Sequence, residues 1–240
     1  MLDYGFPMSL SKTAVKGKRL LIDAALRLTA ATRSLTAISL RELAREAGLN
    51  PNTFYRHFKD FDDLGLAIIE GISADIRKPL RDLRRQAAET TPTHPDSDPW
   101  QLNPRLQMKL ARRVTRITVK LFFDYVASNP NAFILGVREL HGSSPAIRGA
   151  LEQVMREFSE DIAEDIVTLN LLPRIADDAL GELSEAICRD MFQLSMDCIE
   201  QPEERASLCA KAERLITAMA IGQAMLQGHG PLLTEAMAKS

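Results

Sequence analysis

The chain has 240 residues, of which 45% are hydrophobic and 26% charged, so it is long enough to bury a large core without disulfides or a metal. Three widely spaced cysteines, no zinc-ligand spacing, no signal-peptide pattern and no apolar run near the ~20 residues of a membrane helix favour a cytoplasmic protein with no membrane association, cofactor or bound metal. The net charge of −2 divides into +6 for residues 1–59 and −8 for residues 60–240, which suggests a part that binds polyanions joined to an acidic body.

The first quarter of the chain has the pattern of a flexible arm followed by three helices. Residues 1–13 are expected to form the arm, and Lys16–Thr32 carries apolar residues at helical spacing. The segment SLRE is a capping box that opens a short helix ending at Gly48. An Asn-Pro pair, which supplies an N-cap and a proline at the first helical position, opens a second short helix over Pro51–Phe58.

The remainder of the chain also has helical periodicity. A helix is expected from Asp60 to about Glu89, with a kink or interruption at Pro79. Residues 90–103 are rich in Pro, Thr and Asp and are expected to form a loop or linker. Further helices are predicted at Pro104–Ser128, Asn131–His141, Pro145–Asn170, Ala176–Ile199 and Glu203–Gln227.

These patterns together predict an all-α fold of about nine helices, because no alternating run of strand length occurs. We expect a three-helix helix-turn-helix domain at residues 14–60. A helical bundle for ligand binding and dimerisation is expected at residues 61–230, with a short tail at 231–240.

The segment Ser39–Lys59, SLRELAREAGLNPNTFYRHFK, carries the functional signal because its two short helices are joined by a tight turn. Phe54 and Phe58 lie four residues apart and are expected to pack inward. The polar positions of the second helix then point outward, where Asn and Arg recognise base edges and Tyr, His and Lys suit phosphate oxygens. For each single residue the alternative is an ordinary polar surface position, and for Ser39 it is a helix cap alone. The candidate DNA-binding residues are Ser39, Arg41, Asn50, Asn52, Thr53, Tyr55, Arg56, His57 and Lys59.

The stretch ISLRELAREAGLNPNTFYRHFKDFDDL resembles the DNA-binding domain of the TetR family of repressors, with Phe54-Tyr55-Arg56-His57-Phe58 followed by Leu64 as the most specific part. The stretch NPNAFILGVRELHGSSPAIRGAL at Asn129–Leu151 is similar to the fatty-acid-biosynthesis repressors of that family, the FabR/DesT-like branch. The resemblance implies that the second helix of the pair enters the major groove and that a homodimer binds a palindromic operator in double-stranded DNA. It also implies a fatty acyl thioester, such as acyl-CoA, as the effector.

Apolar residues of the body are candidates for the wall of an effector pocket, since such pockets form between the helices of a bundle. The alternative is that they form an ordinary core, which any helical bundle displays with the same spacing. Arg138, Glu139 and His141 are candidates for contact with a polar head group or, equally, for a salt bridge. The candidate ligand-binding residues are Phe122, Phe123, Val126, Phe133, Val137, Arg138, Phe158, Ile162, Met191 and Phe192.

The last two long helices are expected to form the dimer interface, an inference that rests mainly on the family. Alanines and a glycine allow close approach of helices there, and larger apolar side chains supply contact area. The small residues are Ala210, Ala218, Ala220, Gly222 and Ala224, and the larger ones are Leu215, Ile216, Met219, Met225 and Leu226.

The function that these patterns favour is a ligand-responsive repressor of fatty-acid or lipid metabolism genes. An alternative of the same class is a TetR-type repressor of an efflux or degradation operon that responds to another hydrophobic compound.

An enzyme is disfavoured because the sequence has no nucleophile elbow, phosphate-binding glycine loop or dinucleotide fingerprint. The acidic run from Glu152 to Asp165 has carboxylates that could bind a metal, but its spacing favours a solvated helix face. A helical adaptor that binds only proteins is the remaining alternative.

Overall fold

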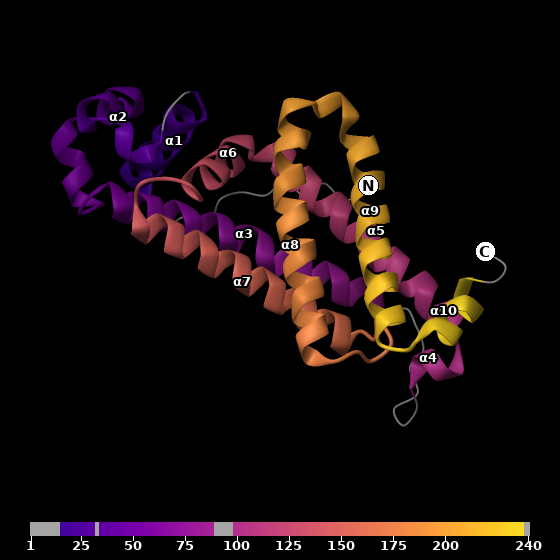
Figure 1. Cartoon of the computed structure of the whole chain (residues 1–240). Coiled ribbons are helices and arrows are strands. Elements are labelled where there is room, and N and C mark those ends of the chain that lie inside the picture. Colours follow the sequence, from indigo (N-terminus) through magenta and orange to yellow (C-terminus); the bar gives the residue numbers. More distant parts are fainter. Residues whose placement is uncertain (1–14, 32–33, 89–97, 238–240) are drawn as a thin grey trace. The chain divides into compact units, whose positions relative to one another are not determined.

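The computed structural model describes residues 15–31, 34–88 and 98–237, and every regular element in these ranges is a helix. The chain forms two compact units, residues 1–76 with 129–154 (unit 1) and residues 77–128 with 155–240 (unit 2). The expected arm at residues 1–13, most of the expected loop at 90–103 and the end of the tail lie outside the described residues. The all-α prediction is confirmed for the described part (Figure 1).

Unit 1 is built from the N-terminal helices together with the first parts of two long helices and one helix from the middle of the chain. Its elements are α1 (Val15–Ala31), the 3-10 helices η1 (Leu35–Ala37) and η2 (Pro51–Arg56), α2 (Leu40–Ala47), α6 (Pro130–Glu139), and the beginnings of α3 (Phe61–Ala88) and α7 (Pro145–Thr168). Both long helices continue into unit 2. The predicted capping signals operate as expected, since Ser39 Oγ accepts from the amide of Glu42 and Asn50 Oδ1 accepts from the amide of Asn52.

The core of unit 1 is one apolar cluster to which all of its helices contribute. Leu21 of α1, Leu43 of α2 and Phe54 of η2 are buried together with Leu64 of α3, Leu135 of α6 and Ile147 of α7. Gly65 of α3 permits the closest of these contacts, because a Cβ there would lie 2.6 Å from Cδ1 of Ile147 and 3.0 Å from Cδ2 of Leu35. Residues 129–154 are therefore part of the same core as the helix-turn-helix.

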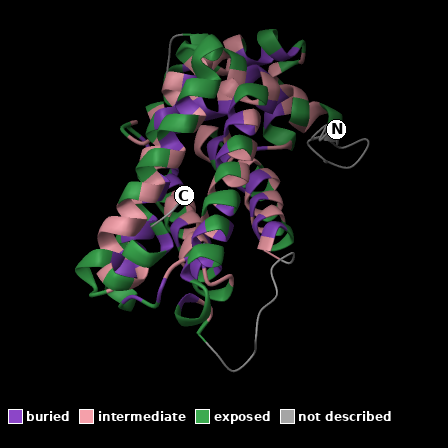
Figure 2. Cartoon of the chain, turned by 90° about the vertical axis from the view of Figure 1, so that its right-hand side faces the viewer, coloured by how far each residue is buried: buried purple, intermediate pink, exposed green. Residues whose placement is uncertain are grey.

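Unit 2 is a helical bundle with short helices at its edges. Figure 1 shows α8 and α9 as neighbouring helices joined by a short turn, and α9 also packs on α5. The buried residues gather where helices face one another (Figure 2). The elements are the remainders of α3 and α7 with α4 (Pro99–Leu102), α5 (Pro104–Ser128), α8 (Asp177–Glu200), η3 (Pro202–Glu204), α9 (Arg205–Leu226) and α10 (Gly230–Met237).

Long-range contacts explain three short helices that were not predicted. Trp100 of α4 is buried and donates its Nε1–H to the carbonyl oxygen of Asn170 at 3.0 Å. Leu233 and Ala236 of α10, in the segment expected to be a tail, are also buried. The third, η1, donates the backbone N–H of Leu35 to the carboxylate of Glu139, 104 positions away, a contact described below.

A ladder of ion pairs joins α3 to α7 in unit 2. Arg77 pairs with Asp161 and Glu157, Arg81 with Asp161, and Arg84 with the buried Asp165 at 2.6 Å. The hydrogen bond to Asp161 raises the pKa of Arg77, whereas burial lowers the pKa of Arg84. The expectation that this acidic run faces solvent was therefore wrong for Asp161 and Asp165.

None of the described helices combines the length and apolar character needed to span a lipid bilayer. Nor do these residues bring three or more His, Cys, Asp or Glu side chains together in a cluster suited to a metal ion.

The end of α2 provides a stability test. Gly48 has a φ of 66°, and a Cβ at this position would meet no other atom within 4 Å. Gly48→Ala should therefore lower the free energy of unfolding by about 1–2 kcal/mol through backbone strain alone. Gly71→Ala, inside α3 and equally open, should raise it by about 0.5–1 kcal/mol. Chemical denaturation of both variants checks the opposite signs, and a gain in stability for Gly48→Ala would refute the left-handed conformation.

Candidate nucleic-acid interface

The helix-turn-helix begins with α2 and continues through a tight turn. Gly48 donates its backbone N–H to the carbonyl oxygen of Arg45 at 3.1 Å, and Leu49 donates to that of Ala44 at 2.9 Å, which ends α2. The second helix, η2, is shorter than the predicted Pro51–Phe58 and has 3-10 geometry, ending at Arg56. A short 3-10 helix has weak hydrogen-bond geometry, so its position depends on the side chains that anchor it.

Aromatic rings anchor η2 to the rest of unit 1. Phe54 is 1% exposed and Phe58 is 3% exposed, so the prediction that both pack inward is confirmed. The ring centroid of Phe54 lies 5.7 Å from that of Phe58 and 5.3 Å from that of Phe61, which stacks on it. Lys18 of α1 places its Nζ 5.4 Å from the centre of the Phe58 ring. These ring contacts hold the Phe54 side of η2 against unit 1 and leave its opposite side exposed to solvent.

The outward side of η2 carries polar groups that are free to reach a partner. Asn52, Arg56 and Lys59 are exposed, and Tyr55 is 65% exposed. Thr53 is half-buried. This face therefore presents an amide, a guanidinium, a phenol and an ammonium group, the donor and acceptor types that contact DNA bases and phosphates.

His57 differs from its neighbours because its ring lies against α1. A Cβ on Gly17 would lie 2.7 Å from Nε2 of His57, so the absence of a side chain at position 17 makes room for the imidazole. His57 is half-buried, and its ring also lies edge-on to Phe58 with centroids 6.5 Å apart. Of the candidate residues, His57 thus combines a packing role with a polar one.

The N-terminus of α3 lies shortly after η2, and aspartates accept hydrogen bonds from the backbone amides there. The amide of Lys59 donates to Asp63 Oδ2 at 2.9 Å, and the amide of Asp63 donates to Asp60 Oδ1 at 2.8 Å. These carboxylates cap the helix, so they occupy amides that an incoming phosphate would otherwise contact. Phosphate binding at this edge would instead fall to Lys59.

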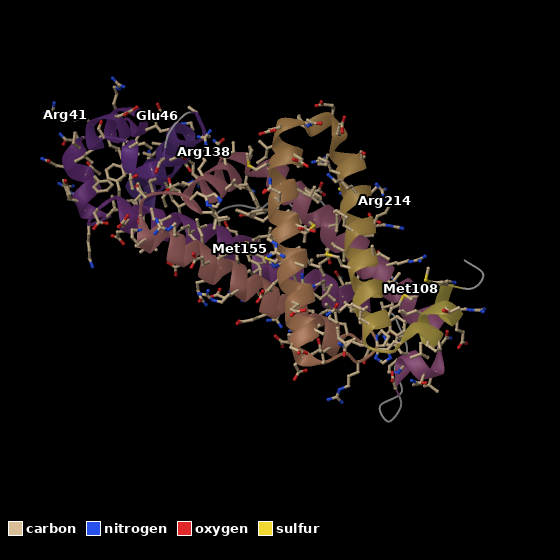
Figure 3. All side chains as sticks on the ribbon, viewed as in Figure 1. Arg41, Glu46, Met108, Arg138, Met155 and Arg214 are labelled. Carbon is tan, nitrogen blue, oxygen red and sulfur yellow. The ribbon has the colours of Figure 1, made fainter. Side chains whose placement is uncertain are left out.

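The remaining candidates lie on or next to α2. Ser39 and Asn50 serve as the caps already described, and both remain exposed. Arg41 is exposed and projects from the end of unit 1 (Figure 3). Arg45 is also exposed, whereas the neighbouring Glu46 accepts a hydrogen bond from Arg27 at 2.7 Å. The structure thus gathers all nine candidates within one stretch of unit 1, with seven of them exposed.

The sequence of this same region decides the family. Residues 21–68 match the family described as "Bacterial regulatory proteins, tetR family", and the match contains α2, the turn and η2. Residues 21–68 thus form a DNA-binding domain of the TetR type. Regulators of the TetR family are non-enzymatic proteins that bind DNA and respond to ligands.

Solved structures have the same fold at low sequence identity. The fatty acid degradation regulator FadR from Bacillus halodurans has a TM-score of 0.62 and 15% identity, and the match covers 86% of this chain and 96% of that one. FadR from Bacillus subtilis, solved with stearoyl-CoA, has a TM-score of 0.59 and 14% identity, with coverage of 82% and 96%. A putative regulator from Pseudomonas aeruginosa PAO1 has a TM-score of 0.61 and 17% identity, with coverage of 88% and 93%.

The candidate ligand-binding residues belong to both units, so the complete set stays a prediction. In unit 2, Phe123 and Val126 are buried, Phe122 lies edge-on to Phe123 with centroids 5.4 Å apart, and the Arg77 guanidinium lies over the Phe158 ring. Met191 is buried, and Ile162 and Phe192 are half-buried. In unit 1, Phe133 is buried and Val137 is half-buried.

Arg138 has a specific position within unit 1. It extends from α6 to the end of α1, where its guanidinium donates to the carbonyl oxygens of Thr29 and Ala30 (Figure 3). A cation at the C-terminus of a helix complements the helix dipole. This contact with a helix end is neither the head-group contact nor the salt bridge expected for Arg138, and the sequence spacing gives no indication of it.

Proposed function

We propose that this TetR-family regulator represses lipid metabolism genes by binding a palindromic operator through η2. The observation that carries the DNA-binding part is the division of residues 51–58 into two sides, with Phe54 and Phe58 buried and Asn52, Tyr55 and Arg56 exposed. Bidentate contacts from Arg to guanine and from Asn to adenine give direct recognition in the major groove. Ser39, Arg41, Asn50, Thr53, His57 and Lys59 would then hold the phosphates on either side.

The effector that we propose is a fatty acyl thioester bound in the helical body. The similarity of Asn129–Leu151 to the FabR/DesT-like branch supports this class of ligand, and two FadR proteins are among the solved structures with the same fold. A repressor of an efflux or degradation operon is the second candidate. The apolar residues of unit 2 favour a hydrophobic effector in either case.

We further propose that α9 mediates homodimerisation. Leu215, Met219, Gly222, Met225 and Leu226 follow one another at helical spacing, and none of them is buried within the protomer. Leu226 is 82% exposed. A helix that is apolar on its outer side is normally covered, and a second copy of the same helix would cover it with an isologous contact. Ala224, by contrast, is buried within the protomer and contributes to its own bundle.

Arg56→Ala tests DNA recognition. If Arg56 contacts a guanine, the variant should lose about 1–3 kcal/mol of binding free energy and relax specificity at one base position. The operator is first obtained by selecting genomic fragments that the purified protein binds, and affinities are then measured by fluorescence anisotropy. Arg112→Ala, which removes the same charge from an exposed site on α5, is the control and should leave the affinity nearly unchanged. Equal affinities for Arg56→Ala and the unaltered protein would show that η2 presents a different side to DNA.

Leu215→Glu and Met225→Glu test the dimer. Each places a charge on the uncovered side of α9 without disturbing a buried contact of the protomer, so the dimer should dissociate while the helices stay folded. Sedimentation equilibrium measures the change. Val167→Glu is the control, because Val167 is also an exposed apolar residue, on α7. Dimers of unchanged strength in both α9 variants would exclude this face.

Acyl-CoA addition distinguishes the two candidate effectors. A long-chain acyl-CoA should change operator affinity by about 5- to 150-fold, a coupling typical of allosteric regulators, whereas free CoA should have little effect. Mass spectrometry of the denatured protein identifies any ligand that co-purifies. Recovery of a non-lipid compound that alters DNA binding, together with no response to acyl-CoA, would favour the efflux or degradation repressor.

A further inference from the structure

Residues 139–144, at the end of α6 and before α7 (the α6–α7 junction), contact the segments that come just before and just after the helix-turn-helix. Glu139 Oε1 accepts two hydrogen bonds just before α2, from the backbone N–H of Leu35 at 2.7 Å and from Ser34 Oγ at 2.8 Å. Just after η2, Ser144 Oγ donates to Asp62 Oδ1 of α3 at 2.7 Å. All of these residues belong to unit 1, so the junction and the DNA-binding elements form one body.

Glu139 is an unusual residue for such a contact because it is only 1% exposed. Burying a carboxyl group is unfavourable unless hydrogen bonds replace its water, and here both donors converge on one oxygen. The second oxygen, Oε2, has no hydrogen-bond partner among the described residues. A buried carboxyl group whose main partner is a backbone amide fixes the position of that amide, here the amide of Leu35.

Gly142 creates the space that Glu139 occupies. A Cβ on Gly142 would overlap Oε2 of Glu139 and would also lie 3.2 Å from its Cα, so any larger residue there must displace the carboxyl group. The amide of Gly142 donates to the carbonyl oxygen of Glu139 at 3.0 Å, which closes the turn. Glu139 and Gly142 therefore depend on each other: Glu139 makes the contact, and the absence of a side chain at Gly142 leaves room for its carboxyl group.

The held amide lies where it can fix the DNA-binding elements. Leu35 is four residues before Ser39, the cap of α2, and its side chain packs in the contact between Gly65 and Ile147. Its backbone is thus fixed by Glu139 while its side chain is fixed by α3 and α7. Exposed Thr36 adds a third contact through a 3.0 Å hydrogen bond with Ser143 Oγ.

We propose that Glu139 is a positioning residue for DNA recognition, which holds the start of the helix-turn-helix in the orientation that presents η2. The proposal rests on the DNA-binding function proposed above. Glu139 acts through Leu35 and Ser34, and it makes no contact with DNA itself. The same contact makes the α6–α7 junction part of the DNA-binding body, although it is more than 80 residues from η2 in the chain.

Four variants of the full chain test the proposal. Glu139→Ala removes the acceptor, and Gly142→Ala displaces it while leaving the glutamate in place; both should weaken operator binding by about tenfold or more. Glu139→Gln keeps an oxygen acceptor for both donors and should remain within about threefold of the unaltered protein. Gly149→Ala is the matched control for Gly142→Ala, because a Cβ at this α7 position meets nothing within 4 Å.

Hydrogen exchange at the Leu35 amide supplies a readout that does not depend on DNA. Exchange of this amide should accelerate by about tenfold or more in Glu139→Ala and Gly142→Ala, while amides in the core of α1 keep their protection. If Glu139→Ala fails to fold, the comparison of Gly142→Ala with Gly149→Ala and the rescue by Glu139→Gln decide the question.

The outcomes separate the positioning role from the DNA-binding function. Operator affinity unchanged in both Glu139→Ala and Gly142→Ala, with the unaltered protein binding tightly, would overturn the positioning role alone. A loss in Glu139→Gln as large as that in Glu139→Ala would also overturn it, because both hydrogen bonds would then be irrelevant. If the unaltered protein selects no DNA, the proposed function fails, and the exchange data still report whether Glu139 holds Leu35.

Discussion

The burial of Phe54 and Phe58 is the interaction on which the candidate interface depends. A 3-10 helix of six residues has little stability of its own, since a short isolated helix does not repay the cost of its nucleation. Complete burial of a phenylalanine side chain contributes about 1.5–3 kcal/mol, so two such rings are sufficient to fix the segment against unit 1. Because both apolar residues face inward, only polar groups remain for the outer side.

Much of this arrangement was predictable because its determinants are local. Caps and turns lie within a few residues of the helices that they end, so Ser39, Gly48 and Asn50 could be assigned from the sequence. Helical periodicity likewise located the long helices to within a few residues. The short helix α4 could not be predicted in this way, because Trp100 is held by a carbonyl group 70 positions away. The packing of His57 on Gly17 escaped prediction for the same reason.

Buried charges were the other feature that periodicity concealed. A pattern that places apolar residues inside and charged residues outside fails when two helices form ion pairs across their interface, as α3 and α7 do. The matched spacing of Arg77, Arg81 and Arg84 with Glu157, Asp161 and Glu164 was a signal that could have revealed the ladder. Glu139 carried no comparable signal, because its partners are a backbone amide and one hydroxyl group.

A single η2 is too small to account for specific DNA recognition. Recognition through η2 therefore depends on the proposed dimerisation through α9. One bidentate contact provides about 1–3 kcal/mol of discrimination, and η2 exposes only Asn52 and Arg56 for such contacts. Specific regulators bind their sites about 4–10 kcal/mol more tightly than other DNA. Two copies of η2 on one palindrome would reach this range, and the uncovered apolar side of α9 is the surface through which unit 2 would bring them together. The accuracy with which each copy is held in its own protomer then determines whether both half-sites are engaged at once, which is the role that we assign to Glu139.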